Sequence, residues 1–501
     1  MSWPNVCNKI IYSDATISAL LTRIFHRKAH KNTKSLLFAA MQTTTKSKSR
    51  KPRKYLMGIS QGIITKIDID DIRVPTSDSL LGSDPFHRKP DYSVALIRIH
   101  NDCGLTGFSV VFGIGAGTDW LVYGLNDLAS LLIGLDIRDF MSDPGKVHRR
   151  LMEHHQLRWL GDGVYRMVVG GLINALWDIW AKLEHKPIWA LLSDLPAETI
   201  LASIDWRYLT DVIRPQEAKK ILEHGQLGLK ERQAEIIKQG PLAYSTSGWL
   251  GLSDADVLKS VMQLRNQGFR HFKAKVGSNL LDDRRRLSLL RRIIGADGQI
   301  MTDANQIWSV NEAIEWMTEL AEFRPFWIEE PTARDDVLGF VRISKAMEQL
   351  NIGVAAGEQI PSPVIFKQML ASGALTHCQV DATRLGGVND VMAVILMAAH
   401  FNIPVCPHGG GIGLCNMIRH YAIWDQIAVS VTSEDRIVEY IDFLQADVFC
   451  APVLVEEGCY VTPESPGWGL EVKPEFLERY RFPYGEVWLD RTGPTGAAFE
   501  A

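Results

Sequence analysis

The sequence has few cysteines and no long apolar run. Its 501 residues include seven cysteines, an odd number, and none of them forms a CxxC pair. A disulfide framework or a structural zinc site is therefore not expected, and a reducing compartment is the default. The best apolar stretch, residues 391–399, is far shorter than the ~18 residues that a membrane span needs. We expect no membrane partner.

Acidic residues are scarce at the start of the chain and abundant after it. Residues 1–60 contain 12 lysines and arginines and one acid, Asp14, so the remainder holds 42 basic and 57 acidic residues. A body with this excess of acid is a poor nucleic-acid binder, and it must hold any anionic substrate at a local cationic site. We therefore expect no nucleic-acid partner.

Residues 1–62 form a basic extension that we predict to be disordered. We expect the protein to be cytoplasmic. Residues 43–54 are polar and basic, and residues 17–41 mix apolar side chains with lysine and arginine without any acid. The same composition fits a mitochondrial transit peptide, which would place the protein in the matrix. A start of translation at Met41 or Met57 is a further alternative.

Two patterns follow the extension. Residues 64–69 and 93–99 alternate as β-strands do, a loop rich in glycine, serine, aspartate and proline joins them, and residues 163–184 have a helical pattern. Residues 63–195 are therefore predicted to form an α+β domain. From about residue 240, short apolar runs alternate with amphipathic stretches, and the barrel domain is predicted over 196–451. The expected strands are 243–247, 272–276, 299–303, 326–330, 353–358, 377–381, 404–408 and 438–441.

This repeat predicts an α/β fold of the (β/α)₈ type, a TIM barrel. A doubly wound open sheet is the alternative, but no glycine-rich phosphate loop follows its first strand. Seven of the expected strands end near a polar residue, at intervals of 23 to 31 residues. These residues are Lys275, Asp303, Glu329, Glu358, Asp381, His408 and Glu439. All strands of a barrel run the same way, so the seven side chains should meet at its C-terminal face, where barrel active sites lie.

Three of these residues predict a metal site. Asp303, Glu329 and Glu358 come from consecutive strands, and ligands that offer only oxygen point to a hard cation, Mg²⁺. Asn305, two residues beyond Asp303, would share its face and supply another oxygen or a substrate contact. Glu330 should point elsewhere by strand alternation.

Basic residues on other strands predict acid–base chemistry. Lys273 and Lys275 alternate onto one face, and two like charges beside a dication should lower a lysine pKa towards neutrality, as a general base requires. His408 precedes three glycines, and Asp381 is placed to hydrogen-bond its imidazole. Glu439 could bind substrate hydroxyl groups or assist this dyad.

The motifs around these residues resemble those of the enolase superfamily, within its mandelate-racemase-like group. They are Lys273-Ala274-Lys275-Val276-Gly277, Thr302-Asp303-Ala304-Asn305-Gln306, Trp327-Ile328-Glu329-Glu330-Pro331, Ala356-Gly357-Glu358-Gln359, Asp381-Ala382-Thr383-Arg384-Leu385-Gly386-Gly387 and Cys406-Pro407-His408-Gly409-Gly410. Other stretches are similar to L-fuconate dehydratases and fungal L-galactonate dehydratases. They include Gln156-Leu157-Arg158-Trp159, Ile204-Asp205-Trp206-Arg207-Tyr208 and Glu439-Tyr440-Ile441-Asp442. The resemblance covers about residues 64–490.

The resemblance implies roles for individual residues. It implies Mg²⁺ on the three carboxylates, Lys275 as base, Lys273 beside it stabilising negative charge, and His408 as acid with Asp381 behind it. A Lys or His base beside Mg²⁺ is described for the superfamily in general. It further implies that the first domain caps the barrel, with a substrate loop at Gly82, Ser83 and Asp84 together with Tyr92. The C-terminal segment, 452–501, is expected to return to this capping domain, and the protein to be a homo-oligomer.

The implied activity is that of a hydro-lyase acting on a small-molecule sugar acid. It would dehydrate L-fuconate to 2-keto-3-deoxy-L-fuconate by removing the C2 proton and the 3-hydroxyl group. L-Galactonate and L-rhamnonate are alternative substrates, and racemisation or cycloisomerisation could run on the same residues. An alternative of another functional class is a barrel that has lost catalytic activity and binds a partner through its basic tail.

Overall fold

The computed structural model describes residues 62–441, 447–489 and 491. The chain divides into two compact units, Met1–Gly58 and Ile59–Ala501, and the described helices and strands all belong to the second. The predicted N-terminal extension lies outside the described residues except for Gly62. None of the helices in the described part of the chain is long and apolar enough to cross a bilayer.

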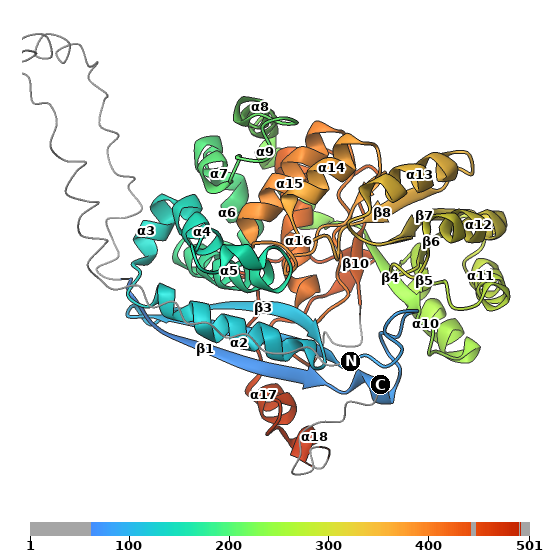
Figure 1. The fold of residues 1–501 in the computed structure, drawn as a ribbon, viewed down its shortest axis with the longest axis horizontal. Helices are drawn as coiled ribbons and strands as arrows, with labels where there is room; N and C mark the ends of the chain where they lie inside the picture. Colours follow the sequence, from blue (N-terminus) through green and yellow to red (C-terminus); the bar gives the residue numbers. More distant parts are fainter. Residues whose placement is uncertain (1–61, 442–446, 490, 492–501) are drawn as a thin grey trace, which may run out of the picture. The chain divides into compact units, whose positions relative to one another are not determined.

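The described chain begins with a three-stranded antiparallel sheet in the order β1-β2-β3 (Figure 1). Its strands are β1 (Ile64–Val74), β2 (Tyr92–Asn101) and β3 (Thr106–Ile114). Val94 in the central strand pairs with Ile72 on one side and with Phe112 on the other. The two strands expected from alternation lie within β1 and β2, whereas β3 was not expected.

Helix α5 (Val164–Leu183) connects this sheet to the barrel. It occupies the predicted helical stretch, with Gly163 and Glu184 as its caps, and it is buried on almost every side. A Cβ atom at Gly170 would overlap the backbone carbonyl of Leu385, so a glycine is required where the helix backbone meets a barrel loop. The other helices before the barrel are α2 (Gly117–Ala129), α3 (Ile137–Ser142), α4 (Pro144–Met152), α6 (Ile188–Asp194), α7 (Ala197–Ser203), α8 (Pro215–Gly225) and α9 (Leu229–Lys238).

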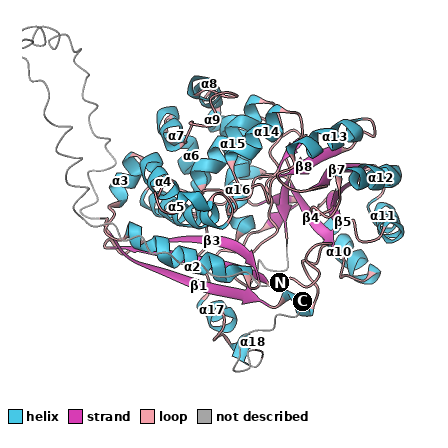
Figure 2. Cartoon of the chain, viewed as in Figure 1, coloured by secondary structure: helices cyan, strands magenta, loops and turns pink. Residues whose placement is uncertain are grey.

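A parallel sheet in the order β10-β4-β5-β6-β7-β8-β9 follows, and helices surround its strands (Figure 2). Its strands are β4 (Ala243–Gly248), β5 (His271–Lys275), β6 (Gln299–Asp303), β7 (Pro325–Glu329), β8 (Gly353–Ala356), β9 (His377–Cys378) and β10 (Val438–Tyr440). Its helices are α10 (Asp254–Asn266), α11 (Leu280–Ile294), α12 (Val310–Leu320), α13 (Val337–Glu348), α14 (Pro363–Ala371), α15 (Val388–His400) and α16 (Leu414–Trp424), the last continued by a π-helix over Asp425–Val429.

Short polar side chains start four of these helices. Ser253, Asn279, Ser309 and Asp336 are the N-caps of α10 to α13, and each side chain accepts a hydrogen bond from a backbone amide in the first turn. These bonds satisfy amides that have no partner inside the helix. The chain therefore turns from strand to helix at defined residues, which fixes the loops at the C-terminal face.

The expected strand at 404–408 is not a regular strand. Only an isolated bridge joins Val405 to Cys378, because Pro404 and Pro407 have no amide hydrogen to donate. The segment nevertheless closes the barrel, since the amides of Cys378 and Glu439 donate to the carbonyls of Pro404 and Pro407 at 2.9 and 3.3 Å. The eight-stranded closure is therefore complete although only seven strands are regular.

The barrel interior has two layers. Apolar side chains fill the layer nearer the strand starts, and the polar residues of the strand ends lie two positions further along the same strands. Met301 and Asp303, Trp327 and Glu329 are such pairs, and period-two alternation directs both members of a pair inwards. The apolar layer consists of Tyr244, Met301, Trp327, Ala355, Cys406 and Ile437.

The C-terminal segment returns to the first sheet, as expected. It contains the hairpin β11 (Val455–Glu456) and β12 (Cys459–Tyr460), and the helices α17 (Pro474–Tyr480) and α18 (Glu486–Leu489). Arg481 bridges to Ile72, and the Trp488 indole donates to the carbonyl of Arg73 at 3.0 Å. The fold is therefore a (β/α)₈ barrel with an α+β capping domain built from both ends of the chain. The predicted boundaries of the barrel domain, between residues 195 and 196 and between residues 451 and 452, stay predictions.

Candidate active site

The polar residues at the strand ends meet inside the barrel and are all buried. Lys273 and Lys275 end β5, and Asp303 and Glu329 end β6 and β7, where they are register partners. Glu358, Asp381 and His408 lie in the segments after later strands, and Glu439 lies in β10. The structure thus brings together every strand-end residue that the sequence singled out.

Three carboxylates form the centre of this cluster. One oxygen each of Asp303, Glu329 and Glu358 lies within 4.8 Å of the others. Burial and the Asp303 carboxylate raise the pKa of Glu329 to about 8. The second oxygen of Glu329, Oε2, is sealed from solvent without a hydrogen-bond partner among the described residues. A donor set made only of carboxylate oxygens, one of them unpartnered, fits a hard divalent cation.

The two lysines have different surroundings. Lys273 Nζ lies 2.8 Å from Glu329, 2.9 Å from Glu439 and 3.4 Å from Asp303. Among the described residues, Lys275 Nζ forms its one ion pair with Asp303, at 2.6 Å, and its other side faces the Trp249 ring at 5.1 Å. Lys275 is therefore the lysine that fewer carboxylates hold in its charged form.

The lowering of a lysine pKa was expected beside a dication, and it stays a prediction for the metal-loaded site. Burial acts to lower the pKa of both lysines, but the carboxylates outweigh it and raise both above the ordinary value. Glu329 and Glu439 are responsible at Lys273, and Asp303 at Lys275. The expectation assumed a dication beside the lysines, and without that charge the carboxylates are left to pair with them.

His408 and Asp381 form a hydrogen-bonded dyad. Nδ1 of His408 lies 2.8 Å from Asp381 Oδ2, while Nε2 lies 3.1 Å from Glu358 Oε2. Burial acts to lower the pKa of His408, but Glu358 and Asp381 raise it to about 10, so the ring is protonated at neutral pH. The other oxygen of Asp381 accepts from the amides of Thr383 and Arg384, which fixes the carboxylate.

Glu439 and Asn305 border the same space. Glu439 accepts hydrogen bonds from the Thr246 hydroxyl at 2.6 Å and from the Gly409 amide at 2.9 Å. Asn305 has a left-handed backbone (φ 45°), and its backbone N–H donates a hydrogen bond to Asp303 Oδ1 at 3.0 Å. Its side-chain oxygen is buried without a partner among the described residues and remains available for a ligand.

The capping-domain loop is fastened to the barrel. The Ser83 hydroxyl accepts a hydrogen bond from the Gly251 amide, in the loop after β4, at 2.8 Å. Gly82 (φ 81°) leaves room for Tyr92, whose ring a Cβ atom would overlap. The Asp84 carboxylate accepts from the amides of Phe86 and His87, so it shapes the loop itself.

Comparison with known proteins agrees with this arrangement. Residues 256–476 match the family described as Enolase C-terminal domain-like. The human protein Mitochondrial enolase superfamily member 1 is 44% identical over 433 residues, which cover 85% of this chain and 98% of that one. Its crystal structure has a TM-score of 0.85, with 43% identity over 86% of this chain and 99% of that chain. The chain belongs to the enolase superfamily.

Two dehydratases of other organisms are also similar. L-Galactonate dehydratase of Hypocrea jecorina is 39% identical over 431 residues, covering 85% of this chain and 95% of the relative. The crystal structure of L-talarate/galactarate dehydratase from Salmonella typhimurium, liganded with Mg and L-lyxarohydroxamate, has a TM-score of 0.66. Its identity of 20%, over 88% of this chain and 97% of that chain, shows a shared fold only.

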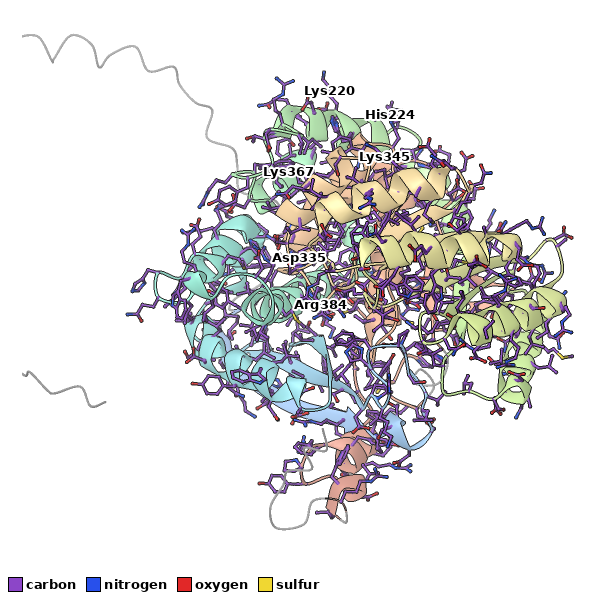
Figure 3. The ribbon with its side chains drawn as sticks, turned by 45° about the vertical axis from the view of Figure 1, so that its right-hand side comes forward. Lys220, His224, Asp335, Lys345, Lys367 and Arg384 are labelled. Carbon is purple, nitrogen blue, oxygen red and sulfur yellow. The ribbon has the colours of Figure 1, made fainter. Side chains whose placement is uncertain are left out.

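Two residues of this enolase-superfamily site were not expected from strand alternation. Glu330 has a left-handed backbone (φ 41°), which breaks the alternation and keeps its side chain buried near the carboxylates, with the Gln306 amide donating to it at 3.1 Å. Arg384, labelled in Figure 3, donates from Nε to the carbonyl of Glu358 at 3.0 Å and contacts Met167 of α5. It therefore joins a carboxylate segment to the capping domain.

Proposed function

We propose that this protein is a Mg²⁺-dependent dehydratase of six-carbon sugar acids, with L-fuconate as its first substrate and L-galactonate as the alternative. The observation that supports this most is the placement of Lys275 and the His408–Asp381 dyad on different strands around one cluster of three carboxylates. L-Fuconate is 6-deoxy-L-galactonate, so both acids present the same groups from C1 to C5. The name of the 39% identical fungal relative, L-galactonate dehydratase, supports the same class of substrate.

Asp303, Glu329 and Glu358 would hold Mg²⁺, with Asn305 and the substrate carboxylate beside them. When bound, the ion supplies positive charge that stabilises negative charge developing on the substrate carboxylate. Lys273, fixed between Glu329 and Glu439, adds a second positive charge at this place. The loop at Gly82, Ser83 and Asp84, with Tyr92, closes over the far end of the sugar acid and excludes water.

The proton transfers follow from the two basic groups. Lys275 Nζ takes the proton from C2, which breaks the C2–H bond. The protonated Nε2 of His408 gives its proton to the 3-hydroxyl group, and the C3–O bond breaks to release water. Asp381 holds Nδ1 and thereby aims Nε2 at the leaving group. The remaining enol tautomerises to the 2-keto-3-deoxy acid.

A substrate panel tests the proposal. The purified full chain with Mg²⁺ is incubated with L-fuconate, L-galactonate, L-rhamnonate and their D-enantiomers, and 2-keto-3-deoxy products are detected with semicarbazide. We expect product from L-fuconate or L-galactonate and none after removal of metal with EDTA. Incorporation of deuterium at C2 without loss of water would instead indicate a racemase. No turnover of any acid, with Mg²⁺ binding intact, would leave a binding role.

The compartment is a separate question, because the extension lies outside the described residues. We propose a cytoplasmic protein, although the name of the human relative places that protein in mitochondria. Residues 1–62 fused to a fluorescent protein should stay in the cytosol; import into mitochondria would establish the transit-peptide alternative. The homo-oligomer also stays a prediction, to be measured by light scattering.

A further inference from the structure

Arg419 is a buried positive charge outside the active site. It lies on α16 with 6% of its surface exposed, and its Nε is sealed from solvent without a hydrogen-bond acceptor. Within the described ranges, no carboxylate forms an ion pair with its guanidinium. An arginine in this position is unusual, because a buried charge is costly unless an opposite charge or hydrogen bonds compensate it.

The groups nearest to Arg419 do not provide that compensation. Burial lowers the pKa of Arg419 to about 10, so the guanidinium is still charged at neutral pH. Its electrostatic neighbours are Tyr460 and Cys415, and burial raises the pKa of both, that of the Cys415 thiol to about 11. Phenol and thiol are therefore neutral at pH 7, and the positive charge stays unbalanced.

The guanidinium lines a cavity of about 140 Å³ between α16 and the segment 451–469. A Cβ atom at Gly469 would make an ordinary van der Waals contact of 3.6 Å with Arg419 Nη2, so this nitrogen lies beside Gly469 at the cavity wall. Ser465 adds a hydroxyl group to the wall, whereas the Thr462 hydroxyl donates to the carbonyl of Ile236, and Glu464 is exposed there without an ion pair to Arg419. The cavity therefore has one strong donor group that no residue of its wall satisfies.

We propose that this cavity binds a small oxyanion, a carboxylate or a phosphate, through Arg419. The planar guanidinium presents paired N–H donors that match two oxygens of either group. A cavity of about 150 Å³ holds a ligand of about six heavy atoms. A six-carbon sugar acid has about twice that number of heavy atoms, so it would not fit entirely within the cavity.

Two contacts link the surroundings of Arg419 to segments of the active site. The Tyr460 hydroxyl donates to the backbone carbonyl of Glu439, and the Cys415 thiol lies 3.5 Å from the carbonyl of Gly409. The electrostatic neighbours of Arg419 therefore support the two segments that carry Glu439 and His408. None of the residues that line the cavity is one of the proposed active-site residues.

Calorimetry with two simple probes tests the proposal. Sodium phosphate and sodium acetate are titrated into the Mg²⁺-loaded full chain at constant ionic strength, which chloride maintains. The variants are Arg419→Met and, as a matched control, Arg342→Met, since Arg342 is exposed on α13. We expect binding of one or both anions, weakened at least tenfold by Arg419→Met and unchanged by Arg342→Met.

The possible outcomes separate cleanly. Tight binding of phosphate alone, or of acetate alone, identifies the source of the oxyanion. Equal affinity in the wild type and Arg419→Met would place the anion elsewhere and overturn the proposal, as would the absence of binding in the wild type. Arg419→Met should melt no lower than the wild type without anion, because it removes an unbalanced buried charge. Arg419→Gln repeats the test if the methionine variant does not fold.

Discussion

Replacing Lys275 is the sharpest test of the proposed chemistry. Within the part of the chain that the structure describes, the side chain has one ionic partner, Asp303 at 2.6 Å, whereas Lys273 is fixed by three carboxylates. Lys275→Ala removes the proposed base and leaves Asp303 within 3.4 Å of Lys273, so the carboxylate keeps a cation. General-base catalysis contributes roughly 10²- to 10⁴-fold, which corresponds to about 3 to 5 kcal/mol in the barrier. Turnover should fall by at least this factor while Mg²⁺ still binds.

Lys275→Arg separates a base from a fixed positive charge. Arginine keeps a cation beside Asp303 but does not give up its proton at any pH of the assay. Both variants should lose turnover and the exchange of the C2 proton with deuterium oxide, measured by semicarbazide detection and by NMR. If Lys275→Arg kept more than about a tenth of wild-type turnover, Lys275 would act through its charge, and the base would have to be another group.

The remaining predictions concern the metal, the acid and the dependence of stability on pH. Asp303→Asn should weaken Mg²⁺ binding by at least roughly a hundredfold in calorimetry, because it removes a charged ligand and the loss of an outer-shell partner alone costs about 10- to 100-fold; unchanged affinity would contradict the proposed metal site. His408→Asn should keep C2 exchange but lose ketoacid formation, since the acid acts after the base; loss of both would give His408 a role in the first step. Burial lowers the pKa of His377 to about 4, below the 6.5 of an unfolded chain, so the unfolded state binds the proton first as pH falls. This contribution to stability is present above pH 6.5, falls by about 2 kcal/mol at pH 5, and should vanish in His377→Gln when urea unfolding is compared at pH 7 and pH 5.

The positions of the site residues could be predicted from the sequence because two simple periodicities agree there. Apolar residues alternate along each strand, and the next inward position after them is polar, as Met301 and Asp303 or Trp327 and Glu329 show. The length of one strand–helix unit then brings the polar positions to the same end of the barrel. Neither step depends on contacts between distant residues.

The elements that were not predicted depend on such contacts. β3 contains Gly107, which lowers strand propensity, but a Cβ atom there would overlap the Ala175 carbonyl of α5. Packing of the sheet against the helix requires the glycine, and a local pattern counts it against a strand. Glu330 depends on a left-handed backbone after β7, and Arg419 on a cavity formed by a segment more than thirty residues away.

The balance of charge in the active site explains why the lysine pKa values could not be predicted from residue identity alone. Fully ionised, the eight groups that the sequence singled out comprise five carboxylates and three cations, which leaves two negative charges in excess, and the buried Glu330 beside them adds a third. The eight groups are Asp303, Glu329, Glu358, Asp381, Glu439, Lys273, Lys275 and His408. In the protein alone, the excess favours protons: the pKa of Glu329 rises to about 8 and both lysines hold their protons more tightly. A dication beside the lysines would offset most of this excess, so we expect a lysine that can accept a proton only in the metal-loaded site, where its pKa depends on distances between charges from separate strands.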